Sequence, residues 1–209
     1  MKSVIALGIA AASLLGCSML ESTGSPGGYD DGAGWTTLID GTRMSGLHAI
    51  QAADWHAADG AIVATKGVGF LMTDKEYGDF QIRAEFYAEA DTNSGVFIRC
   101  EGDGHQNPTS NACYEVNIWD VRPKPEYGTG AIVDVAAVTP SMPKAGGHWN
   151  TYDITAKGDH FVVMPNGVKT ADVHNGKHVK GLVGLQFAQG NDKEHPSPLK
   201  WRKVQIRSL

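Results

Sequence analysis

The segment FQIRAEFY (residues 80–87) decides the fold class, because apolar and polar side chains alternate along it. Neighbouring side chains on a β-strand point to opposite faces. The four apolar side chains are therefore expected to face a core, and they are Phe80, Ile82, Ala84 and Phe86. Glu85 and Tyr87 are expected on the opposite face of the same strand.

Short alternating segments recur along the rest of the chain. Turn-forming residues separate them, and the chain has 26 glycines and nine prolines. They cover residues 60–64, 95–100, 113–120, 130–135, 150–156, 160–164, 181–187 and 200–209. No stretch keeps an apolar period of 3.6 residues over three turns, as an amphipathic helix would. Short strands at this spacing predict an all-β fold, an antiparallel β-sandwich.

Alternation also assigns faces in residues 95–100 and 113–120. The side chains expected to point away from the core are Phe97, Arg99, Glu115, Asn117 and Trp119. Together with Glu85 they predict one surface that carries acids, an arginine, an amide and aromatic rings. Aromatic rings lie against the apolar face of a sugar, and planar polar groups bind its hydroxyls. The alternative is an ordinary solvated sheet face with cross-strand Glu–Arg pairs.

The N-terminus predicts export. Lys2 precedes an apolar run (residues 4–15) that is too short to span a bilayer, so residues 1–16 are typical of a signal peptide. The sequence LLGC (residues 14–17) resembles the bacterial lipobox, in which the cysteine, here Cys17, becomes lipid-modified. An ordinary secretory signal is the alternative. Residues 17–34 have no apolar period and predict a flexible tether, which leaves a single folded domain over residues 35–209.

General lipoprotein sorting implies that Ser18, after the lipidated cysteine, directs a protein to the outer membrane. We therefore expect the chain in the cell envelope, on the periplasmic side of the outer membrane, held to the membrane by its lipid anchor only. The net charge is −5 and no basic run exists, which argues against a nucleic-acid partner. The scattered histidines lack ligand spacing, so we predict no metal site and no cofactor.

Export also changes how the remaining cysteines are interpreted, because disulfides persist outside the cytosol. Cys100 and Cys113 bracket a segment rich in turn-forming residues. If the flanking segments are neighbouring strands, a disulfide between the two cysteines is geometrically plausible. Two unpaired buried thiols are the alternative.

Ordered motifs over residues 35–209 resemble those of the 3-keto-disaccharide hydrolase family. They begin with GWTTLIDG (residues 34–41), are most specific in NSGVFIR (93–99) and YEVNIWD (114–120), and close with WRKVQI (201–206). The resemblance implies a concanavalin A-like jelly-roll β-sandwich of two antiparallel sheets. It also implies a sugar or glycoside as ligand.

The resemblance implies chemistry at a sugar with a ketone at C3, which acidifies the proton on C2 so that the C1 substituent is eliminated. This route needs a base near C2 and a donor for the enolate oxygen. On this basis Glu115 is the first candidate base and Glu85 the second, and Arg99 is the candidate oxyanion partner. Hydrolysis by Glu85 and Glu115 as a pair is the alternative. The residues expected to orient the sugar are Tyr87, Asn93, Asn117, Trp119 and Gln186.

Two departures from the family pattern bear on activity. The family commonly has histidine and glycine within two residues of its Gly-Leu-Gln motif, whereas FAQG (residues 187–190) follows Gln186 here. Asn117 stands where glutamine is usual. These departures keep open a non-catalytic carbohydrate-binding or scaffold lipoprotein, and a lipoprotein that binds cell wall or protein and has no affinity for sugar.

Overall fold

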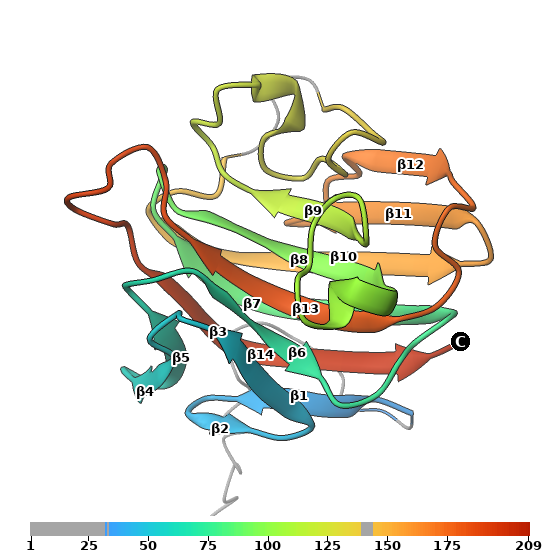
Figure 1. The fold of residues 1–209 in the computed structure, drawn as a ribbon, viewed down its shortest axis with the longest axis horizontal. Coiled ribbons are helices and arrows are strands. Elements are labelled where there is room, and N and C mark those ends of the chain that lie inside the picture. The colour runs from blue at the N-terminus through green and yellow to red at the C-terminus, as the bar shows by residue number, and fades with distance from the viewer. Residues whose placement is uncertain (1–31, 33, 139–143) are drawn as a thin grey trace, which may run out of the picture. The chain divides into compact units, whose positions relative to one another are not determined.

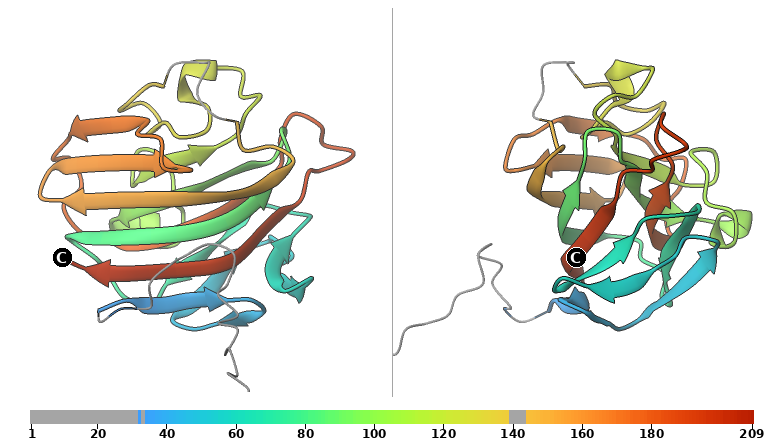
Figure 2. Two further views of the ribbon diagram at one scale, coloured as in Figure 1. Left: turned by 180° about the vertical axis from the view of Figure 1, so that it is seen from behind. Right: turned by 90° about the vertical axis from the view of Figure 1, so that its left-hand side faces the viewer.

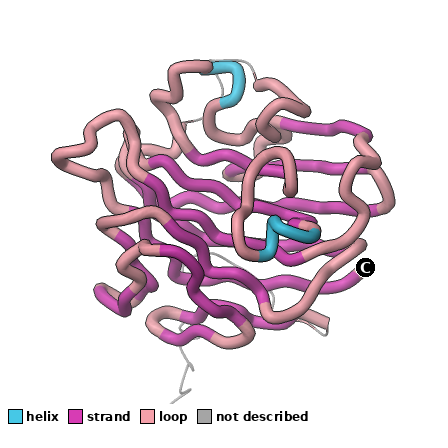
Figure 3. Tube along the Cα trace, viewed as in Figure 1, coloured by secondary structure: helices cyan, strands magenta, loops and turns pink. Residues whose placement is uncertain are grey.

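The computed structural model describes residue 32, residues 34–138 and residues 144–209. These residues form an all-β domain of two antiparallel sheets, as predicted, with two short helical turns among them. Figure 3 shows how strands and loops make up nearly all of this domain. The helical turns are η1 (Gly102–His105) and η2 (Pro125–Tyr127). Within the described part of the chain, no helix is long and apolar enough to cross a membrane.

The nine-stranded sheet has, in spatial order, β12 (Ala171–His174), β11 (His160–Pro165), β10 (His148–Lys157), β7 (Phe80–Ala88), β14 (Leu199–Ser208), β1 (Thr36–Asp40) and β2 (Arg43–Met44), with β5 (Ala61–Ala64) paired to β14 and β4 (His56–Ala58) paired to β5. The five-stranded sheet has the order β3 (Leu47–Gln51), β6 (Gly69–Thr73), β13 (Leu182–Ala188), β8 (Asn93–Cys100) and β9 (Tyr114–Ile118). Figures 1 and 2 show the two sheets stacked as the layers of a sandwich.

The core lies between the two sheets. The four apolar side chains of β7 are fully buried, as alternation predicted, and they are Phe80, Ile82, Ala84 and Phe86. Val96, Val116 and Leu185 meet them from the five-stranded sheet in one apolar cluster. Burying a large apolar side chain contributes about 1.5–3 kcal/mol. Burial of the inward-facing side chains of many strands therefore stabilises the packing of the two sheets.

Eight of the nine predicted segments contain a strand of the structure. Residues 130–135 do not, because Gly130 and Asp134 have φ of +88° and +59° and break the extended backbone, which forms isolated bridges through Ile132 instead. The prediction also missed six strands, which are β1, β2, β3, β4, β6 and β12. β6 shows why: it is buried on both faces and therefore has no polar alternation.

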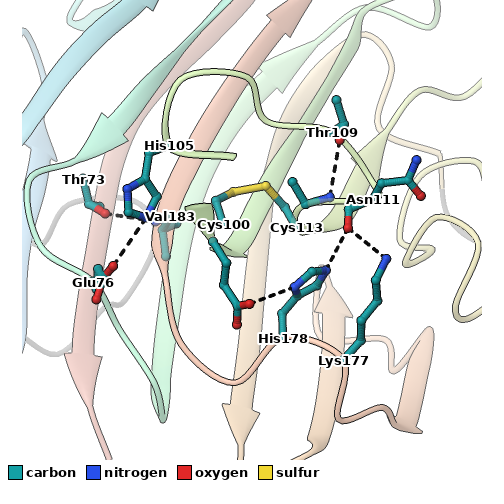
Figure 4. Close-up of a disulfide and its surroundings, with 12 residues drawn as sticks. Thr73, Glu76, Cys100, His105, Thr109, Asn111, Cys113, Lys177, His178 and Val183 are labelled. Atoms are coloured by element: carbon teal, nitrogen blue, oxygen red, sulfur yellow. Dashed lines mark hydrogen bonds and ion pairs between the residues drawn. A yellow bond between two sulfur atoms is a disulfide. The ribbon is translucent and has the colours of Figure 1, made fainter. Parts of the chain in front are cut away.

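The predicted disulfide is confirmed, because Cys100 and Cys113 are bonded. The bond closes a loop that contains η1 and packs on the outer face of the five-stranded sheet, over an apolar cluster that includes Phe70, Met72 and Phe97. Figure 4 shows how the loop between β12 and β13 holds it: Lys177 Nζ and His178 Nε2 contact the backbone oxygen of Asn111 at 2.8 and 3.1 Å. The disulfide loop therefore covers the part of this face around Phe70, Met72 and Phe97.

Candidate functional site

The outer face of the five-stranded sheet brings three of the predicted site residues together. Gln186 on β13 lies opposite Gly95 on β8, and Gly95 lies opposite Asn117 on β9. Glu115 lies two residues before Asn117, opposite Phe97. Gly95 therefore lies between the amides of Gln186 and Asn117 and places no side chain there. A Cβ atom at this position would lie 2.9 Å from the backbone oxygen of Val116.

Glu115 is the largely buried acid of this face. Its side chain is 12% exposed, and its Oε1 lies 3.9 Å from Nη1 of Arg122. Burial raises the pKa of Glu115 to about 7; Arg122 opposes the rise and Asp134 adds to it. A carboxyl with a pKa near neutrality is suited to take up a proton and to return it.

Two amide oxygens beside Glu115 are buried without a partner among the described residues. Asn117 Nδ2 donates to the backbone oxygen of Tyr127 at 2.6 Å, which fixes the amide and leaves Oδ1 unpaired. Gln186 Oε1 is buried and unpaired in the same way. A buried acceptor without a donor costs free energy, so this face favours a ligand that brings hydroxyl donors.

Trp119 is held at the edge of this face by a residue that the sequence did not reveal. Its Nε1 donates to Asp91 Oδ1 at 3.0 Å. Asp91 also accepts the backbone N–H groups of Asn191 and Asp192 at 2.9 and 2.8 Å. Burial favours a higher pKa for Asp91, but these hydrogen bonds outweigh it and lower the pKa. A charged Asp91 therefore joins the end of β9 to the loop after β13.

Asn93 lies next to that loop. Its Nδ2 donates to the backbone oxygen of Gln189 at 3.3 Å. Gly190, which follows Gln189, cannot carry a side chain, because a Cβ there would lie 1.9 Å from the backbone oxygen of Asp91. Asn93 thus contacts the loop that Asp91 also holds, at the end of the face where Trp119 lies.

The prediction that Glu85 and Tyr87 share this surface is wrong. Both lie on β7, which belongs to the nine-stranded sheet, and their side chains point away from the core on that sheet's outer face. Glu85 accepts a hydrogen bond from Arg202 Nε at 2.5 Å, and Tyr87 donates one to Glu89 at 2.6 Å. The whole apolar core therefore separates Glu85 from Glu115. Alternation gives the face of a strand and not the sheet to which it belongs.

The predicted place of Arg99, on the outer face beside Glu115, is also wrong. Arg99 has φ of +52°, next to a register shift between β8 and β13, and its fully buried side chain turns inward over the ring of Phe161 at 5.0 Å. It donates to the backbone oxygens of Gly78 and Gly158 at 2.9 and 2.7 Å, and further to His178 and Asp79. Arg99 is therefore a structural arginine with its donors in use.

Arg122 is a cation beside Glu115 on this face, and the alternation of the strands did not reveal it. It follows β9 by four residues, and its guanidinium lies 5.9 Å from the ring of Trp119. Its position three residues after Trp119 was the available signal. No group of three or more His, Cys, Asp or Glu side chains that could hold a metal ion occurs among the described residues.

Comparison with known proteins gives the fold and the family. A family model described as a 3-keto-α-glucoside-1,2-lyase-like domain matches residues 34–207. A candidate glycosyl hydrolase from Parabacteroides distasonis ATCC 8503 is 26% identical, with a TM-score of 0.67 over 84% of this chain and 99% of that chain. No curated protein matches the sequence.

Two further solved structures share the fold at lower identity. A β-glucanase from Bacillus licheniformis is 12% identical, with a TM-score of 0.59 over 86% of this chain and 100% of that chain. A carbohydrate-binding module from Bacillus subtilis is 14% identical, with a TM-score of 0.53 over 84% and 96%. These likenesses confirm the concanavalin A-like jelly roll that the sequence motifs implied.

Proposed function

Because the chain belongs to the family of 3-keto-α-glucoside-1,2-lyase-like domains, we propose that it cleaves the glycosidic bond of a 3-keto-glycoside on the outer face of its five-stranded sheet. One observation carries the proposal: a carboxyl with a pKa of about 7, Glu115, lies in one surface with two buried, unpaired amide oxygens. The first group suits proton transfer, and the other two suit a polyhydroxyl ligand.

In the proposed reaction the Glu115 carboxylate takes the proton from C2 of the sugar. The electron pair of that bond forms an enolate with the C3 carbonyl. When the carbonyl re-forms, a double bond arises between C1 and C2, and the C1 substituent leaves as an alcohol after taking up one proton. Addition of water across the double bond then gives the free keto-sugar. Glu115 returns its proton in this sequence, which a pKa near neutrality permits.

The amides and Trp119 have the binding roles. Asn117 Oδ1 and Gln186 Oε1 accept hydrogen bonds from sugar hydroxyls, and the indole of Trp119, oriented by Asp91, offers an aromatic edge to the site. Asn93 acts with them by holding the adjoining loop. Glu85 has no part in this proposal, because it lies across the core and is paired with Arg202.

The test compares Glu115→Gln with Glu85→Gln, the same change on the opposite sheet. We expect Glu115→Gln to lower kcat on a 3-keto-glycoside by about 10²–10⁴-fold, since a general base is lost. Binding of the glycoside, measured by calorimetry, should change little. Glu85→Gln should keep wild-type kcat. Equal turnover by wild type and Glu115→Gln would refute the role of Glu115.

A second candidate function is a carbohydrate-binding protein without turnover. It is favoured by the FAQG sequence (residues 187–190) after Gln186, which lacks the histidine that the resemblance led us to expect. The same experiment separates the two functions. Binding of the keto-glycoside by the wild type, with no release of alcohol and no exchange of the C2 proton with deuterated water, would establish the non-catalytic function.

We further propose that the mature protein is a lipoprotein of the cell envelope, anchored through Cys17 on the periplasmic side of the outer membrane. Residues 14–17, which support this proposal by sequence, lie outside the described residues. Mass spectrometry of the mature N-terminus and membrane fractionation of wild type and Cys17→Ala test it. Release of Cys17→Ala from the membrane fraction is expected, and equal partition of the two proteins would contradict the anchor.

A further inference from the structure

Arg122 differs from the other arginine near the site in how its donors are used. Its side chain is 19% exposed, yet it makes no hydrogen bond to any residue that the structure describes. Its neighbours are the carboxylate of Glu115 at 3.9 Å and the ring of Trp119 at 5.9 Å. A guanidinium has five N–H donors, and burying most of it without acceptors is costly. Such a group is suited to an acceptor that arrives with a ligand.

We propose that Arg122 binds the C3 oxygen of the substrate and stabilises the negative charge that develops there when Glu115 removes the C2 proton. This inference rests on the proposed function. It assigns to Arg122 the oxyanion role that the sequence pattern gave to Arg99, whose donors are already taken by Gly78, Gly158 and His178.

The distance between Arg122 and the base fits this role. C3 is bonded to C2, so the oxygen on C3 and the proton on C2 are close together in any substrate pose. A base and a cation whose atoms lie 3.9 Å apart can therefore contact the two ends of one reacting unit. The planar fork of the guanidinium can donate two parallel hydrogen bonds to the enolate oxygen and a neighbouring hydroxyl.

Arg122 also acts on Glu115 in the free protein, since its charge opposes the rise in the pKa of Glu115. Loss of that charge should raise the pKa further. The acid limb of the pH profile of kcat/KM, which reports the free enzyme's base, then moves to higher pH. A residue with only a structural role would not move this limb.

The experiment measures kcat, KM and the pH profile on a 3-keto-glycoside for wild type, Arg122→Gln and Arg122→Lys. Arg43→Gln, an exposed arginine on β2 whose side chain is 83% exposed, is the matched control. We expect Arg122→Gln to lose about 10²–10³-fold in kcat, as for removal of an oxyanion donor, with a small change in KM. Arg122→Lys keeps the charge but not the fork and should fall between Arg122→Gln and wild type.

The outcomes separate the two proposals. No turnover by the wild type overturns the proposed function and this inference with it. Turnover by the wild type and by Arg122→Gln at equal rates overturns the role of Arg122 alone, and so does a rate loss with an unmoved acid limb. If Arg122→Gln does not fold, Arg122→Lys carries the test, and wild-type kcat in that variant contradicts the inference.

Discussion

The outer faces of the two sheets carry the same three residue types in opposite states. On the nine-stranded sheet Glu85 accepts a hydrogen bond from Arg202 at 2.5 Å, and Arg202 stacks on Trp149 at 4.2 Å. On the five-stranded sheet Glu115 lies 3.9 Å from Arg122, which lies 5.9 Å from Trp119. We call the first set the closed trio and the second the open trio.

The difference between the trios shows that residue type alone does not mark a site. In the closed trio the carboxylate and the guanidinium satisfy each other, so neither needs a ligand. In the open trio the acid is largely buried and poorly paired, and unpaired amide oxygens lie beside it. Buried donors and acceptors without a partner in the protein are the groups that a bound substrate would hydrogen-bond.

The largest expected effect on stability separates Arg99, whose donors are hydrogen-bonded within the protein, from Arg122 of the open trio. Arg99→Met should lower the free energy of unfolding by about 3–5 kcal/mol, because it breaks a buried network and leaves the backbone oxygens of Gly78 and Gly158 without the Arg99 donors. Arg122→Met should change it by less than about 1 kcal/mol, as for a residue without hydrogen bonds. Urea unfolding of both variants checks this, and similar losses in both would erase the distinction.

The next effect concerns pH and tests the open trio directly. The folded-state pKa of Glu115 is raised from 4.5 to about 7, so between these pH values the folded protein holds a proton that the unfolded chain has lost. The free energy of unfolding therefore falls as pH rises from 4.5 to 7, in total by about 3 kcal/mol. The reason is that a proton held by the folded state alone changes this free energy by about 1.4 kcal/mol per pH unit. Glu115→Gln lacks this loss, because glutamine does not titrate.

Wild type and Glu115→Gln should thus have similar stability near pH 4, and the variant should be more stable at pH 8. Urea unfolding at the two pH values measures the difference. Glu85→Gln is the control on the closed trio. A constant difference between Glu115→Gln and wild type across pH would show that Glu115 titrates normally, and the contrast between the trios would then be lost.

The smallest expected effect concerns the unpaired amide oxygen of Gln186. Gln186→Leu removes a buried acceptor that has no donor, so the free energy of unfolding should stay the same or rise by about 1 kcal/mol. Affinity for the glycoside should fall about tenfold, the loss expected for one hydrogen bond of this size. Urea unfolding measures the free energy of unfolding, which should not fall, and calorimetry measures the affinity for the glycoside, which should fall. Unchanged affinity would place the sugar away from Gln186.

The sequence predicted the parts of the fold that depend on local geometry. Alternation identified the core side of β7, and the turn-rich segment between Cys100 and Cys113 identified the disulfide. The same period-2 rule placed Glu115 and Asn117 on the outer side of β9 correctly. It failed for β6, where both faces are buried and no alternation exists.

Two of the three site residues placed wrongly, Glu85 and Arg99, show what a local rule cannot give. Glu85 and Glu115 both point away from the core, but their strands pair with different neighbours, and pairing is set by contacts between distant segments. At Arg99 one residue with positive φ beside a register shift reverses the face on which the side chain lies. Sequence alone thus determined which side chains avoid the core, because that follows from strand geometry. Only the tertiary structure decided which of them meet and which remain unpaired, because sheet membership and hydrogen-bond partners are set by packing.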